Sequence, residues 1–213
     1  MDTNIRRFQS AEKPPMPRMR AQQRRRQLLE VAANLFARLG YRGATTAELA
    51  KAAGITEPIL YRHFDNKLDL FVTLVDEVGR EVIAGLEKAL HGVNDAGERL
   101  QVLLAGNPAT HEKGKGVYRV IFQAMTEAEG DPAIATAIKR HLTKLHRFVA
   151  DELASLQRAG AIRKDEPASG LAWLIMNVAV GYGMTSPLGL GKPSRGAKSS
   201  MERLLTDLLS VDQ

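Results

Sequence analysis

The chain has 213 residues, 44% of them apolar, which is enough to bury a core as one large domain or two small ones. It contains no cysteine, which excludes disulfides, thiolate metal sites and cysteine nucleophiles. No run of 18 apolar residues could span a membrane, and no apolar segment follows the N-terminal charges as in a signal peptide. These features fit a cytoplasmic protein.

The net charge of +6 is concentrated at the N-terminus. Residues 1–26 hold eight basic and two acidic residues, and the rest of the chain is balanced. A basic arm ahead of a neutral body favours attraction to a polyanion, DNA first and an anionic membrane second, although a solubilising tail has the same composition. Residues 1–20 also contain three prolines and are expected to be disordered. Met16 and Met19 leave a later natural start open.

The elements from residue 21 onward are predicted to be helical. Apolar residues recur on one face of the first segment, at Leu28, Ala32, Leu35, Phe36 and Leu39. Gly40 is placed to end this helix as a C-cap. Two short helical units follow, over about 46–53 and 57–64, and then a long helix over about 67–90.

Further helix-like segments are predicted near 95–106, 116–129, 132–159, 167–185 and 200–210. No segment alternates with the period of two that a strand requires, and residues 187–198 are rich in glycine and proline, which predicts a loop. We therefore expect an all-α protein of about nine helices. Its expected domains are a three-helix head over 21–66 and a helical body over 67–213, after the arm over 1–20.

The most informative stretch is TTAELAKAAGITEPILYRHFDNKLDL, residues 45–70. Thr45 and Glu48 have capping-box spacing, which predicts a helix start. Gly54 suits a tight turn because glycine adopts a left-handed backbone freely, and Thr56 is a good N-cap for the next helix. Two short helices joined by a glycine-containing turn predict a helix-turn-helix, whose second helix enters the major groove of DNA.

This stretch resembles the signature of the tetracycline-repressor (TetR) family, T-x-x-x-(I/L)-A-x-x-A-G-(V/I)-(S/T)-x-x-x-(L/I)-Y-x-(H/Y)-F-x-x-K. The matching residues are Thr46, Leu49-Ala50, Ala53-Gly54-Ile55-Thr56, Leu60-Tyr61, His63-Phe64 and Lys67. The resemblance covers residues 24–70 closely and the rest only in layout. It implies a DNA-binding transcriptional regulator with a dimerising, effector-binding body.

The candidate DNA contacts are ten side chains of the head: Arg24, Arg25, Thr46, Thr56, Pro58, Ile59, Tyr61, Arg62, His63 and Lys67. The resemblance implies phosphate contacts for four of them, Thr46, Tyr61, His63 and Lys67. It places Thr56, Pro58 and Ile59 over the groove. Arg62 could read guanine or bind a phosphate. Glu57 could accept from cytosine, or it could only complement the helix dipole.

Two sets of body residues are candidates for further sites. An effector pocket could be lined by Tyr118, Phe122, Met125, Trp173, Met176 and Asn177, although core packing explains most of these side chains equally well. A dimer interface could use Leu171, Leu174, Ile175, Val178, Tyr182, Leu204, Leu205, Leu208 and Leu209, or these could close the subunit's own core. A homodimer is expected because one short recognition helix reads too few base pairs to select a genomic site.

The remaining motifs support no other class. The five histidines do not have metal-ligand spacing, and no catalytic signature or phosphate loop is present, so we expect no metal, no cofactor and no enzyme activity. We expect a repressor that a small-molecule effector releases from a palindromic operator in double-stranded DNA, with no membrane partner. The alternative is an architectural protein whose basic arm binds any duplex.

Overall fold

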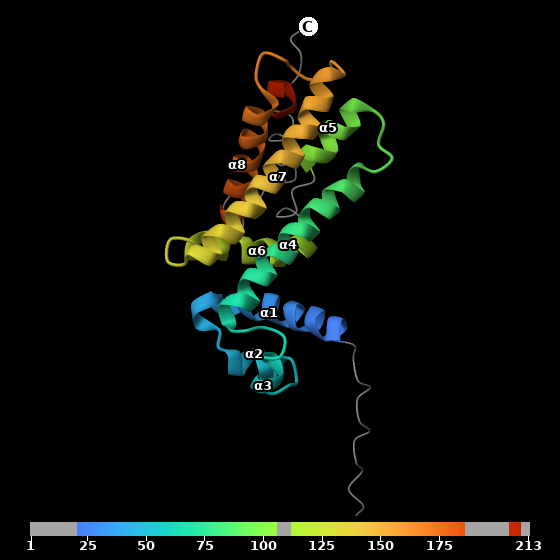
Figure 1. Ribbon diagram of the computed structural model, residues 1–213. Coiled ribbons are helices and arrows are strands. Elements are labelled where there is room, and N and C mark those ends of the chain that lie inside the picture. The colour runs from blue at the N-terminus through green and yellow to red at the C-terminus, as the bar shows by residue number, and fades with distance from the viewer. Residues whose placement is uncertain (1–20, 106–111, 186–204, 210–213) are drawn as a thin grey trace, which may run out of the picture.

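The computed structural model describes residues 21–105, 112–185 and 205–209, all of them helical or in turns and loops (Figure 1). The helices are α1 (Ala21–Gly43), α2 (Thr46–Ala52), α3 (Glu57–Leu60), α4 (Lys67–Leu90), α5 (Ala96–Ala105), α6 (Glu112–Glu127), α7 (Pro132–Arg158) and α8 (Ala168–Thr185), with a short helical segment at 205–209. The predicted all-α class is confirmed. The arm over 1–20 and the loop over 187–198 lie outside the described residues.

The head consists of α1, α2 and α3, at the bottom of Figure 1. Gly40 interrupts α1 with a positive φ of 78°, which confirms the predicted helix end there. The capping box at α2 is also confirmed, because Glu48 N–H donates to the Thr45 hydroxyl and the Glu48 carboxylate accepts from Thr45 N–H. Gly54 has a φ of 67° in the turn that follows.

The second helix of the motif is shorter than predicted. We expected a helix over 57–64, but α3 ends at Leu60, and His63 N–H then bonds to the carbonyl three residues earlier, as in a 3₁₀ turn. Leu60 and Phe64 are buried as expected. Because the last turn is tightened, Tyr61 and Arg62 lie on a turn rather than in the helix.

Helix α4 connects the head to the body and has the predicted bounds (Figure 1). Asn66 caps its first turn by accepting from Asp69 N–H at 2.9 Å. Helix α6 gives a second connection, since Gln123 donates to the Phe36 carbonyl of α1 at 2.7 Å and Arg42 pairs with Glu127 at 2.8 Å. The body therefore contacts the head through both α4 and α6.

The hydrophobic core forms two clusters. One joins the head to the first half of α4, the second half of α6 and the start of α7, and the other joins the second halves of α4 and α7 to α5 and α8. Along α4 the division falls between Val78 and Val82, farther into the chain than the expected domain boundary at 66/67. The head thus shares its core with the base of the body.

His141 of α7 lies between the two clusters. It is only 3% exposed, and neither ring nitrogen has a hydrogen-bond partner. The ring packs against Gly79 of α4, where a Cβ would lie 2.6 Å from His141 Nδ1. Burial lowers the pKa of His141, and the charge of Asp76 raises it to a smaller degree. The helix pair α4–α7 therefore encloses an imidazole that is costly to protonate.

We expect His141 to make the folded protein sensitive to mild acid. The pKa of His141 is lower in the folded than in the unfolded protein. Below the ordinary histidine pKa of about 6.5 the unfolded chain therefore binds a proton more readily than the folded one, and the free energy of unfolding falls as the pH falls. The free energy of unfolding, measured by urea denaturation between pH 7.5 and 5, should fall less in His141→Leu than in wild type. If the free energy of unfolding fell by the same amount over this pH range in His141→Leu and in the exposed control His91→Gln, the expectation would be contradicted.

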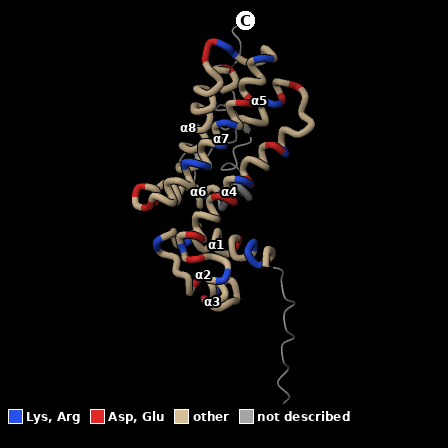
Figure 2. The backbone as a smooth tube through the Cα atoms, viewed as in Figure 1, with Lys and Arg blue, Asp and Glu red and all other residues tan. Residues whose placement is uncertain are grey.

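Basic and acidic residues are interspersed along the backbone of both head and body (Figure 2). Among the helices that the structure describes, none combines the length and apolar character needed to cross a membrane. Nor do three potential metal ligands gather anywhere in the described ranges.

Candidate DNA-binding surface

The helix-turn-helix presents a small exposed surface made by α3 and the turn after it. Pro58, Ile59, Tyr61 and Arg62 are exposed, whereas Leu60 anchors the helix in the core of the head. Thr56 stands at the N-cap position with an extended backbone, but its side chain makes no capping bond and is exposed. The three side chains that the sequence predicted to lie over the major groove, Thr56, Pro58 and Ile59, are therefore all exposed on this surface.

Three side chains connect α2 to α3 through a chain of hydrogen bonds. Tyr61 OH donates to Thr46 Oγ1 at 3.2 Å, and Thr46 Oγ1 donates to Glu57 Oε1 at 2.6 Å. Glu57 and Tyr61 are one helical turn apart, so both reach the start of α2. Neither role that the sequence suggested for Glu57, accepting from cytosine or complementing the helix dipole, included this contact. Because it depends on how α2 and α3 pack, spacing alone does not reveal it.

Two predicted DNA contacts are engaged inside the head. Arg25 donates to the His63 carbonyl at 2.5 Å, and its guanidinium lies 4.4 Å from the centre of the Phe64 ring. Lys67 Nζ donates to the carbonyls of Tyr41 and Ala44, both at 3.0 Å. These cations hold α1 to the motif, so in this conformation the two terminal nitrogens of Arg25, bonded to His63 and Thr73, and two of the three Lys67 donors already have protein partners.

Three further predicted contacts, His63, Arg24 and Arg62, differ in how they can bind an anion. Burial lowers the pKa of His63, and the charges of Arg25 and Arg24 lower it further. A neutral imidazole can donate to a phosphate through one nitrogen only, without a net charge. Arg24 donates to Gln27 within α1 at 2.8 Å. The Arg62 guanidinium, in contrast, has no ion pair or hydrogen bond among the described residues.

The head is similar to one known kind of DNA-binding domain. Residues 28–74 match the family described as bacterial regulatory proteins, tetR family, over a range that includes the whole helix-turn-helix. The chain therefore carries a tetR-family domain in its head. Its relatives include the transcriptional activator FasR of Mycolicibacterium smegmatis, 30% identical over 122 residues, which are 57% of this chain and 55% of FasR. The chain thus aligns with just over half the length of FasR.

Longer matches extend into the body at lower identity. The nucleoid occlusion factor SlmA of Alteromonas mediterranea is 25% identical over 167 residues, 78% of this chain and 83% of SlmA. Among solved structures, a transcriptional regulator from Saccharomonospora viridis in complex with choline has a TM-score of 0.77 at 24% identity, over 88% of this chain and 95% of that one. The TetR-like fold therefore includes the body as well as the head.

The effector candidates in the body do not surround one site. Tyr118, Phe122 and Met176 belong to the body cluster, whereas Met125 packs against the head-side cluster. Trp173 is 44% exposed and stacks on His146 of α7, with ring centroids 4.5 Å apart. Asn177 is also exposed. The candidates thus divide between the two cores and the outer face of α8.

The dimer candidates are likewise divided. Leu171 and Leu209 are buried in the subunit's own core, Ile175, Val178 and Leu205 are partly buried, and Leu174 and Leu208 are exposed. Leu204 and the side chain of Tyr182 lie outside the described residues. Sequence reasoning missed Met184, which is exposed on the same helix as Leu174. The outer face of α8 is therefore apolar at Trp173, Leu174 and Met184.

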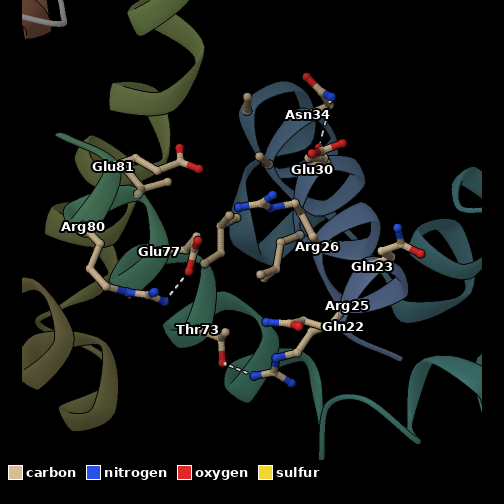
Figure 3. Close-up of a pocket in the computed structure, with 15 residues that line it drawn as sticks. Gln22, Gln23, Arg25, Arg26, Glu30, Asn34, Thr73, Glu77, Arg80 and Glu81 are labelled. Carbon is tan, nitrogen blue, oxygen red and sulfur yellow. Dashed lines mark hydrogen bonds and ion pairs between the residues drawn. The ribbon is translucent and has the colours of Figure 1, made fainter. Parts of the chain in front are cut away.

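One cleft of about 920 Å³ lies between α1 and the first half of α4 (Figure 3). Its floor includes Leu29, Leu74 and Val78, and its rims carry side chains of both charges. Arg25 reaches Thr73 across its lower end, and Arg80 pairs with Glu77 on α4 (Figure 3). No pattern in the sequence predicted this cleft, because it is formed between two helices that are far apart along the chain.

Proposed function

We propose that the protein is a sequence-specific DNA-binding transcriptional regulator that acts in the cytoplasm as a homodimer. One observation carries this proposal: the exposed surface of α3 and the following turn gathers Pro58, Ile59, Tyr61 and Arg62. An arginine fork can read guanine, and apolar side chains can pack against thymine methyl groups in the major groove. The tetR-family match over the same residues supports this surface as the one that binds DNA.

The proposed dimer uses the outer face of α8. Trp173, Asn177, Gly181 and Met184 recur at intervals of three and four residues and are all exposed, with Leu174 beside them. Large apolar side chains exposed together on one helix are typical of a surface that another subunit covers. This face replaces Leu171 and Leu209, which the subunit's own core already uses. Two heads joined in this way would read the two halves of a palindrome.

Replacing Leu174 with glutamate should weaken the dimer. The substitution puts one buried charge on each side of a two-fold interface, so we expect the dimer dissociation constant to rise at least about tenfold. Sedimentation equilibrium measures this change directly. Leu39→Glu is a matched control, since Leu39 is 41% exposed and Leu174 37%, but Leu39 lies on α1. Equal weakening in both variants, or in neither, would contradict the assignment of α8.

The proposed effector is a small molecule bound in the body near Tyr118 and Phe122. Burial raises the pKa of Tyr118 to about 12, so its hydroxyl stays protonated at neutral pH. The Saccharomonospora viridis regulator of the same fold is in complex with choline, which supports a small-molecule effector for this chain without identifying it. A ligand could move the head through α4 and through the Gln123 and Arg42 contacts of α6. Coupling of this kind is typically about 1–3 kcal/mol.

Selection of genomic fragments by the purified full chain, at about physiological salt, tests the proposed function. We expect recovery of a few fragments that share an inverted repeat, and the genes beside them would indicate the direction of control. Uniform recovery of fragments would instead support the architectural alternative, in which charge alone binds the duplex.

A further inference from the structure

We propose that Glu57 sets the specificity of the recognition surface by opposing contacts to the DNA backbone. This inference rests on the proposed function. Its starting point is the hydrogen-bond chain from Tyr61 through Thr46 to the Glu57 carboxylate, with donor–acceptor distances of 3.2 and 2.6 Å. Glu57 is only partly buried, and it lies beside the exposed Pro58 at the edge of the recognition surface.

The chain of hydrogen bonds uses both hydroxyl protons. Each hydroxyl has one proton to donate, and the Tyr61 proton points to Thr46 while the Thr46 proton points to Glu57. A DNA phosphate is only an acceptor, so it cannot accept a hydrogen bond from the Thr46 or Tyr61 hydroxyl until one of these bonds opens. If Thr46 turns to a phosphate, the Glu57 carboxylate loses its bonded donor at the protein–DNA interface.

The charge of Glu57 acts in the same direction. A phosphate bonded to the Thr46 hydroxyl would lie within a few ångströms of the Glu57 carboxylate, and like charges at that separation repel. Every duplex presents phosphates, so this cost applies to binding at any sequence. A base amino group in the major groove, such as cytosine N4, can offset this repulsion because it donates a hydrogen bond to the carboxylate. Glu57 therefore favours sequences that present such a donor over those that do not.

The test compares Glu57→Gln with wild type, both full-length, on a recovered operator and on random duplexes, by fluorescence anisotropy across a salt series. Glutamine keeps an oxygen that Thr46 can donate to, so the surface stays assembled while the charge is removed. We expect affinity for random duplexes to rise about three- to tenfold. The slope of log K against log salt should become steeper by up to about 0.9 for each head. Operator affinity should rise less, so the specificity ratio should fall.

Glu87→Gln is the matched control, because it removes the same charge from an exposed position on α4 about 30 Å along the helix from Lys67. A Glu57→Gln protein with the wild-type salt slope and specificity ratio would overturn the inference, as would equal changes in both variants. These results differ from failure of the proposed function, in which the wild-type protein itself would recover no shared sequence.

Discussion

Replacing Arg62 with alanine should weaken operator binding by about 1–3 kcal/mol for each head. Arg62 is an exposed cation on the recognition surface, and its guanidinium has no partner among the described residues. In a homodimer the change occurs twice, so the combined loss is about 30-fold to 20,000-fold in affinity. Anisotropy titration of a recovered operator measures it. Random duplexes, titrated in parallel, report how much of the loss is independent of sequence.

The pattern of the loss distinguishes the two roles open to Arg62. If Arg62 reads guanine, the variant loses its preference at one position of each half-site and keeps its salt slope. If it binds a phosphate, affinity falls about equally for all sequences and the salt slope decreases by roughly one ion for each head. Arg158→Ala is the control, since Arg158 is exposed at the far end of α7. Unchanged operator affinity in Arg62→Ala would contradict the proposed recognition surface.

Gly79→Ala should destabilise the protein even though alanine is the better helix former. Alanine in a helix interior is favoured over glycine by about 1 kcal/mol. At position 79, however, the new Cβ would lie 2.6 Å from His141 Nδ1 and 3.1 Å from His141 Cγ, inside a closed core. Overpacking of this kind costs about 1–3 kcal/mol, so the net free energy of unfolding should fall by up to about 2 kcal/mol. Chemical denaturation measures the change.

Gly85 provides the control on the same helix. A Cβ at Gly85 meets no atom within 4 Å, so Gly85→Ala should stabilise the protein by about 0.5–1 kcal/mol. In a His141→Ala background the obstacle is removed, and Gly79→Ala should then stabilise as Gly85→Ala does. If Gly79→Ala behaves like Gly85→Ala in the wild-type background, the close contact between α4 and α7 is not as described.

The head could be predicted from sequence because its structure is set by local rules. The Thr45–Glu48 capping box and the left-handed Gly54 are both defined within a few residues of chain, and both are confirmed. The bounds of α4 followed from its apolar face and its capping residue. Only the end of α3 was wrong, because a helix and a 3₁₀ turn bury Leu60 and Phe64 equally well.

Contacts between distant segments could not be predicted in the same way. Arg25 and Lys67 were predicted to contact DNA, and the sequence did not reveal that they also bind backbone carbonyls. The carbonyl that Arg25 binds lies 38 residues away along the chain, and the two that Lys67 binds lie 26 and 23 residues away. Helix α8 is apolar on most sides, so its sequence does not distinguish the face that Leu171 buries from the face that exposes Leu174. The partner of Glu57 and the cleft between α1 and α4 likewise depend on packing.

Footprinting of the full chain on a recovered fragment tests most directly whether two recognition surfaces read one site. We expect two protected half-sites in inverted orientation, with centres about one helical turn of DNA, roughly 34–36 Å, or a multiple of it, apart. Protection should be lost with Arg62→Ala at protein concentrations that saturate the wild-type complex. A single protected block without symmetry, or uniform protection along the fragment, would contradict a dimeric sequence-specific regulator.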